Sequence, residues 1–236
     1  MKHEEKALTC LYAITGHDVP EKVISEMPGI AGEPLYPVRH KEIAAIAGTA
    51  KKNRFAFDKS AALAYGMILD TLCESFTVLP CRFGALLNDD GAVTEVLQKR
   101  YAFYERKLVE LEGKKEFGLK IFSGAKDSAM CSIQCDKKPN DGKEYILQKF
   151  QQFKADNELK KGTERAIDVI RLELQEISSK FKESSQTDGQ VAFSGNYLVE
   201  KKDADFFCSK VKVLQGQYSE LKFLLTGPWP PYNFVF

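Results

Sequence analysis

The spacing of hydrophobic positions changes along the chain and separates strands from helices. Leu8, Leu11 and Ile14 lie in a short apolar run that Gly16 closes, which is the pattern of a buried strand. Over residues 58–76 the apolar positions recur three and four apart, as one face of an amphipathic helix requires. In the first half of the chain this reasoning predicts strands at 8–16, 35–39, 42–50, 77–87 and 117–122, and helices at 58–76 and 91–112.

The order of these elements indicates a fold class for the first half. Residues 42–50 fit either a strand or a short helix, and Asp58 or Ser60 is the expected N-cap of the helix at 58–76. Gly113 is the expected end of the helix at 91–112. Strands followed by helix, strand, helix and strand suit a sheet with helices on one face, the plan of a ferredoxin-like α+β sandwich.

The second half also mixes helices and strands. Residues 143–183 keep a roughly helical spacing of apolar positions, which predicts one long helix or two helices joined near Lys161 and Gly162. The remaining predicted elements are a strand at 191–202, a helix at 203–213 and a strand at 219–227. The whole chain is therefore expected to be α+β, with long helices in its second half.

A polar stretch separates the two halves. Residues 124–142 are small, polar and rich in turn formers, without sustained periodicity, so we expect an inter-domain linker there. The predicted domains are residues 1–123 and residues 143–236, the second ending in an extended tail at 227–236.

The tail combines prolines with aromatic residues. Pro228, Pro230 and Pro231 remove backbone donors and force extended or turn geometry, so the pattern argues against a helix. Because exposed aromatic rings would form a large apolar patch, we expect the tail to dock on the protein's own domains. A proline-stiffened segment also loses little entropy on binding, so one ring can dock while another contacts a partner.

The string TVLPCRFG at residues 77–84 is the second segment, after the tail, with an unusual composition. It places Pro80 and Gly84 around Arg82 in an otherwise apolar strand. A lone arginine in such a strand is expected to be a structural hydrogen-bond donor rather than a catalytic group.

Composition and charge narrow the function classes. The chain has 236 residues, 44% of them hydrophobic and 28% charged, with a formal net charge of +1, as in ordinary soluble globular proteins. Such a balance generates no strong field for polyanions, so nucleic-acid binding is not expected. No apolar run approaches the roughly 20 residues needed to span a bilayer. The start of the chain has no apolar signal-peptide core, so we expect a cytoplasmic protein whose six cysteines stay reduced.

Catalytic and metal-binding patterns are weak. His3, His17 and His40 fall in predicted termini or loops, with no HExxH, GxSxG or phosphate-binding loop. Cys131 and Cys135 are spaced more widely than a CxxC knuckle and are expected to be surface thiols. We therefore predict no catalytic, cofactor-binding or metal site.

Several strings together resemble one known family. LTGPWPPYNF near the C-terminus, FTVLPCRFG after the ALAYGMILDTL helix, EFGLKIF and the LYAITG start follow the order and spacing of the gas vesicle GvpL/GvpF family. The two family motifs comprise Pro80, Arg82, Phe83 and Gly84, and Gly227, Pro228, Trp229, Pro230, Pro231 and Tyr232. Two positions depart from the pattern: Tyr65 stands where the family often has histidine, and Cys81 where it usually has an aliphatic residue. Tyrosine is a poor base at neutral pH, so acid–base work at this position is disfavoured.

The resemblance implies a two-domain α+β assembly factor that is not an enzyme and has no cofactor. It implies contacts with the hydrophobic shell protein GvpA and with other accessory gas vesicle proteins, without nucleic acid and without a membrane span. A shell protein that lines a gas space needs its apolar face shielded before assembly, and a soluble partner can provide this by helix-in-groove docking or strand addition. We expect the N-terminal domain to supply that surface, with the tail bracing it. The alternatives are a scaffold among accessory proteins without direct shell binding, or a cytosolic enzyme.

Overall fold

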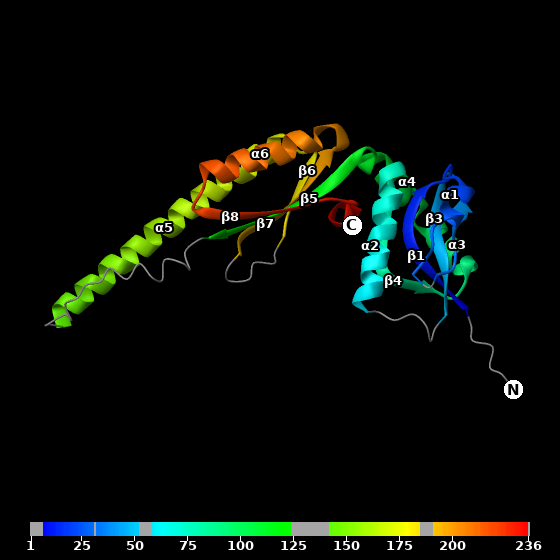
Figure 1. The fold of residues 1–236 in the computed structure, drawn as a ribbon, viewed down its shortest axis with the longest axis horizontal. Helices are drawn as coiled ribbons and strands as arrows, with labels where there is room; N and C mark the ends of the chain where they lie inside the picture. The colour runs from blue at the N-terminus through cyan, green and yellow to red at the C-terminus, as the bar shows by residue number, and fades with distance from the viewer. Residues whose placement is uncertain (1–6, 31, 52–57, 124–141, 185–190, 236) are drawn as a thin grey trace. The chain divides into compact units, whose positions relative to one another are not determined.

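The computed structural model describes residues 7–30, 32–51, 58–123, 142–184 and 191–235. They contain two four-stranded sheets and divide into two compact units. The first unit runs to Glu116 and includes the tail from Trp229 onward, and the second unit is Phe117–Pro228. Helices and strands are mixed in both units, which confirms the predicted combination of helices and sheets (Figure 1). The ferredoxin-like arrangement stays a prediction.

The first unit is built around one sheet. Its elements are β1 (Ala7–Gly16), α1 (Glu21–Ser25), β2 (Leu35–His40), β3 (Ile43–Lys51), α2 (Lys59–Ser75), β4 (Val78–Leu87), α3 (Asp90–Lys99), α4 (Tyr101–Leu111) and, in the tail, α7 (Tyr232–Val235). The strand order is β2-β3-β1-β4, and β1 pairs antiparallel with both neighbours. Residues 42–50 thus belong to a strand, and the helical alternative is wrong.

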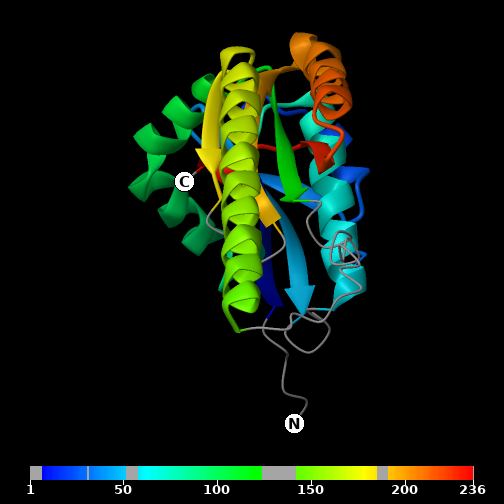
Figure 2. The same ribbon diagram turned by 90° about the vertical axis from the view of Figure 1, so that its left-hand side faces the viewer.

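Helices cover both faces of this sheet, where the sequence predicted one face. α2 packs on one side through a core that includes Leu69 and Leu72, whereas α3 and α4 contact the sheet from the other side (Figure 2). The central strand β1 is buried from Thr9 to Thr15, so its side chains are covered in both directions. Burial on both faces explains why this segment has a continuous apolar run rather than an alternation.

The predicted helix at 91–112 is two helices. Arg100, at φ −122° and ψ 21°, leaves the helical region and separates α3 from α4. Asp89 caps α3 by accepting a hydrogen bond from the Ala92 N–H, as Asp58 caps α2 through the Ala61 N–H. The apolar positions keep helical spacing across the break, with Leu97 and Tyr104 both buried, so periodicity could not reveal it.

The second unit places two helices on one face of its sheet (Figure 1). Its elements are β5 (Lys114–Ser123, shared with the first unit up to Glu116), α5 (Gly142–Glu176), β6 (Lys180–Glu183), β7 (Val191–Glu200), a 3-10 turn (Lys201–Asp203), α6 (Ala204–Gln217) and β8 (Leu221–Trp229). The strand order is β6-β7-β5-β8. Ile170 and Leu174 of α5 and Phe207 of α6 pack on the sheet residues Phe117 and Tyr197.

Of the two alternatives for residues 143–183, one long helix is confirmed. α5 continues through Gly162, because one glycine costs a long helix only about 1 kcal/mol. Residues 180–183 form β6, because they pair antiparallel with β7 from Lys180 opposite Leu198 to Glu183 opposite Gly195. This strand depends on a partner distant in sequence, which local periodicity does not contain.

The sequence-based domain boundaries, 1–123 and 143–236, stay a prediction. The predicted linker, apart from residue 142, lies outside the described residues. The contacts of the described residues divide the chain within β5 and join the tail to the first unit. Across the described ranges, none of the helices has the length and apolarity to cross a membrane.

Candidate functional site

The LPCRFG string forms a wide bulge in β4. Leu11 of β1 pairs with Ala85, but Ala13 pairs with Pro80, so Tyr12 alone lies opposite residues 81–84. Gly84 has φ +80°, a conformation that side-chain-bearing residues rarely adopt. Pro80 is tolerated because β4 is an edge strand of the sheet. The motif therefore forms an irregular sheet edge, at which strand pairing is locally interrupted.

Tyr65 on α2 satisfies the backbone of this bulge. Its hydroxyl lies 2.9 Å from the Tyr12 carbonyl oxygen and 2.6 Å from that of Cys81, and it shares its single proton between these acceptors. Its ring stacks on Tyr12 and meets Phe83 edge-on, with centroid separations of 5.5 and 5.3 Å. Tyr65 thus holds two strands and the motif phenylalanine in one arrangement.

Tyr12 is itself fixed on both sides. Its hydroxyl accepts a hydrogen bond of 2.9 Å from the Ile30 N–H. A side chain at Gly48 would come within 3.2 Å of the Tyr12 ring and 2.9 Å of Leu35, so glycine makes room for this ring. The bulge is consequently backed by a closely packed aromatic cluster.

The thiols and phenols around the bulge are neutral at physiological pH. Burial raises the pKa of the Cys10 thiol to about 11 and that of the Cys81 thiol to about 12. Burial likewise raises the pKa of Tyr12 to about 12, although the bond from Ile30 lowers it in part. The pKa of Tyr65 is raised further by burial. Protonated thiols and phenols are weak nucleophiles, so this cluster suits a structural role.

Arg82 does not make the structural hydrogen bond that was expected. It is exposed on the bulge, and within the described ranges its guanidinium has neither a hydrogen bond nor an ion pair. An exposed guanidinium at an interrupted strand edge is available to a partner.

The tail docks on the first unit. Pro230, Pro231, Phe234 and Val235 are buried, and the backbone N–H of Asn233 donates to Glu116 Oε2 at 2.8 Å.

The side-chain amide of Asn233 donates to the other oxygen, Oε1, so both oxygens of the Glu116 carboxylate hold this residue. Glu116 is only 3% exposed. Lys107 Nζ adds a bond of 2.9 Å to the Phe234 carbonyl and an ion pair with Glu110. These contacts are charge-assisted and fix the end of the chain.

Two tail rings remain partly exposed. Trp229 is 44% and Tyr232 40% accessible, whereas Phe234 is buried.

The prediction that the tail contains no helix is wrong, since α7 forms one turn directly after Pro231. Proline fits the start of a helix, where its missing N–H has no helical partner to lose.

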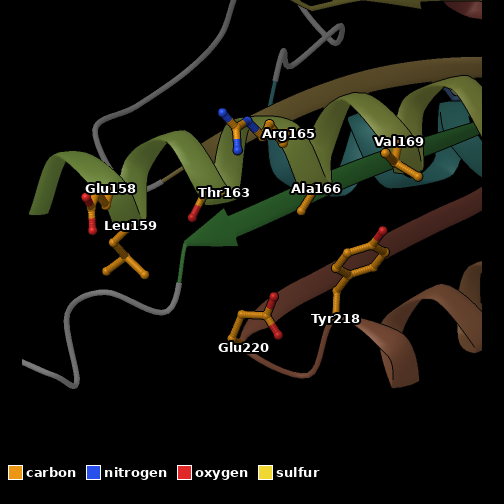
Figure 3. A pocket seen from close by; sticks show the side chains of 9 residues that line it. Glu158, Leu159, Thr163, Arg165, Ala166, Val169, Tyr218 and Glu220 are labelled. Carbon is orange, nitrogen blue, oxygen red and sulfur yellow. The ribbon is translucent and has the colours of Figure 1, made fainter. Parts of the chain in front are cut away.

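The second unit contains a pocket (Figure 3). It has a volume of about 480 Å³ and lies between α5 and the turn before β8. Leu159, Ala166 and Val169 of α5 and Tyr218 and Glu220 of the turn line it. Gly162 also lines it, and a Cβ atom added there would meet no atom within 4 Å.

The other candidate residues lie apart from one another. His17 is 3.6 Å from Glu42, and the His40 ring packs edge-on against Tyr101 at the end of β2. His3, Cys131 and Cys135 lie outside the described residues. In the part of the chain that the structure describes, no three metal-ligating side chains are grouped.

Sequence reasoning missed the residues that hold the tail. Glu116 directly precedes the predicted strand at 117–122 and follows two lysines, so its place in the sequence gave no sign that it is buried. A buried carboxylate needs partners, and those partners lie more than 110 residues away at Asn233. The pairing could not be deduced from spacing.

Comparisons with known proteins agree with this architecture. The family model described as gas vesicle synthesis protein GvpL/GvpF matches residues 9–236. Gas vesicle protein F of a Streptomyces species is 26% identical, over 96% of this chain and 99% of that protein. Gas vesicle protein F1 of Halobacterium salinarum is 24% identical, over 89% of this chain and 85% of that protein.

Solved structures show the same fold. The crystal structure of GvpF from an Anabaena species matches with a TM-score of 0.78 at 21% identity, covering 98% of each chain. GvpF from Microcystis aeruginosa matches with a TM-score of 0.75 at 20% identity, covering 98% of this chain and 99% of that chain. Because the family model spans nearly the whole chain, this protein belongs to the gas vesicle GvpL/GvpF family.

Proposed function

We propose that this protein is an assembly factor that binds the hydrophobic shell protein GvpA during gas vesicle formation, using its first unit. The observation that carries the proposal is the docked tail. Phe234 and the Glu116–Asn233 contact anchor it, while Trp229 and Tyr232 stay about two-fifths exposed. Partly exposed aromatic rings on a rigid support are typical of binding surfaces, because little entropy is lost when they are covered.

Other features of the first unit support the same proposal. α2 carries Leu63 and Met67 on its outer side, 61% and 70% exposed and one turn apart. The bulge in β4 presents Arg82 at a sheet edge. An apolar segment of a shell protein is expected to cover such rings and side chains and so to be kept from aggregating.

Three finer points belong to the proposal. The first unit is proposed to follow a ferredoxin-like plan, the protein to act in the cytoplasm at nascent vesicles, and its partners to include other accessory gas vesicle proteins. We propose no catalytic role, since the thiols of Cys10 and Cys81 have raised pKa values and hold their protons at neutral pH.

Co-expression with GvpA and purification of the soluble complex tests the proposal. Wild-type protein is expected to co-purify with GvpA, and Trp229→Ala to reduce recovery about tenfold, since a buried interface tryptophan contributes roughly 2 kcal/mol or more. Phe206→Ala is the matched control, because Phe206 is an exposed aromatic residue of the second unit. Truncation after Thr226 removes the whole tail, and circular dichroism separates lost binding from lost folding.

A complex that never forms would contradict shell binding. Retention of other accessory proteins in the same experiment would then favour the second candidate function, a scaffold without direct contact to GvpA. If the Trp229→Ala variant recovers as much GvpA as the wild type, the tail is not part of the interface.

A further inference from the structure

The N-terminal part of α5 carries apolar side chains that the described residues of its own unit leave exposed. Ile146, Leu147, Phe150 and Phe153 are between 52 and 69% exposed. In Figure 1 this part of the helix extends beyond the ends of β7 and β8 of the same unit. We call these four residues the α5 stripe.

The α5 stripe is a separate face and does not continue the core face of the helix. Ile146, Phe150 and Phe153 are four and three residues apart, so they share one side. At about 100° per residue, the side that carries the core residue Ile170 is rotated by roughly 100° from Phe153. The stripe therefore does not face the sheet of its own unit, even if that sheet extended further along the helix. This points to a partner other than the sheet.

Lysines border the α5 stripe on both sides. By helical spacing, Lys149 lies on one flank of the stripe and Lys154 on the other, in line with Leu147, whereas Lys160 and Lys161 lie about two turns beyond Phe153, past Asp156 and Glu158. Lys154 Nζ is 4.8 Å from the centre of the Phe150 ring, which holds a positive charge at the rim of the apolar surface. In paired helices, flanking charges choose the partner, and two copies with the same sign repel.

We propose that the α5 stripe binds an amphipathic helix of another protein whose apolar face is flanked by aspartate and glutamate. The apolar residues provide the buried contact, and the lysines select acidic flanks and accelerate association. This interaction surface is independent of the shell-protein binding proposed for the first unit.

Two synthetic helical peptides test the proposal against the full-length chain. Both peptides carry leucine and isoleucine at the a and d positions of about three heptads, and one has glutamate at e and g whereas the other has lysine. Fluorescence anisotropy is expected to give at least about tenfold tighter binding of the glutamate peptide, with a preference that shrinks as salt rises.

Variants locate the binding surface. The double substitution Phe150→Ser with Phe153→Ser is expected to weaken binding of the glutamate peptide at least about tenfold. Leu172→Ser is the matched control, because Leu172 is 52% exposed on the same helix outside the stripe. Circular dichroism confirms that both variants keep their helix content.

Equal binding of the two peptides, no binding, or unchanged binding by the double variant would overturn the proposal. A concentration-dependent dimer in sedimentation that the double variant abolishes would overturn it as well, since a second copy of this chain would then occupy the stripe.

Discussion

The two units bury their tyrosines in different ways. Tyr65 in the first unit is 3% exposed, and its hydroxyl meets the carbonyl oxygens of Tyr12 and Cys81. Tyr197 in the second unit is fully buried, and across the described ranges its hydroxyl has no hydrogen-bond partner. Its ring instead packs against Phe181 and Phe207. Buried polar groups therefore hold irregular backbone in the first unit, whereas ring packing dominates in the second.

The comparison extends to the family motifs. The bulge depends on the Tyr65 hydroxyl, and the tail depends on the buried carboxylate of Glu116. A buried polar group without a hydrogen-bond partner lowers the stability of the fold. Any other arrangement of the motif that breaks one of these contacts is therefore disfavoured. The first unit is expected to be the more sensitive of the two to conservative polar substitutions.

Raising the pH is expected to give the largest difference in stability between the first and the second unit. Cys10, Cys81 and Tyr12 have pKa values near 11, 12 and 12 when folded, against ordinary values of 9 for thiols and 10 for tyrosine. At a pH between the unfolded and the folded pKa of such a group, the folded chain keeps a proton that the unfolded chain has released. The free energy of unfolding is therefore constant below about pH 9 and falls as pH rises towards 12. We expect the free energy of unfolding to fall by several kcal/mol.

Urea titrations followed by the fluorescence of Trp229, the single tryptophan, measure this fall in the first unit. Cys81→Ala is expected to make the decline with pH shallower, whereas Cys208→Ala, a half-buried thiol of the second unit, should leave the slope nearly unchanged. A urea midpoint that stays constant up to pH 12 would refute the burial of these groups.

Removing the carboxylate that holds the tail is the next largest change. Glu116→Ala leaves the two Asn233 donors without their acceptor and is expected to cost about 3 kcal/mol. The free energy of unfolding from urea titration measures this cost. Glu95→Ala, which removes an exposed ion pair with Lys99, should change stability by less than about 1 kcal/mol. Equal losses in the two variants would mean that the tail contact contributes little.

The tyrosine pair tests the comparison directly. Tyr65→Phe removes the only hydroxyl shown to reach the Tyr12 and Cys81 carbonyls together and should cost about 1–3 kcal/mol. The same urea titration measures it, and circular dichroism checks that the variant keeps its fold. A loss no greater than that of an exposed tyrosine substitution would argue against the bulge as a stabilised feature.

Tyr197→Phe is expected to have the smallest effect, and with the opposite sign. The substitution removes a buried hydroxyl without a partner, so stability should stay the same or rise by up to about 1 kcal/mol. Thermal unfolding followed by circular dichroism measures it. A clear loss would show that the hydroxyl is satisfied in solution, for example by a buried water molecule.

Local patterns predicted the elements whose type shows in the spacing of their own apolar residues. The apolar run of β1 and the period of α2 were readable from the sequence, and Asp58 was one of two candidate caps, with Ser60. The break at Arg100, the pairing of β6 and the turn of α7 were missed, because each depends on contacts distant in sequence or on a single backbone conformation. The family motifs were recognised from their letters, whereas Tyr65 and Glu116 explain them physically.

Hydrogen–deuterium exchange of this protein with and without GvpA tests the central claim most directly. If the first unit binds the shell protein through its docked tail, backbone amides of residues 229–235 and of α2 should exchange more slowly in the complex. Peptides from the second unit should stay unchanged or nearly so. Protection confined to the second unit, or absent throughout, would contradict the account.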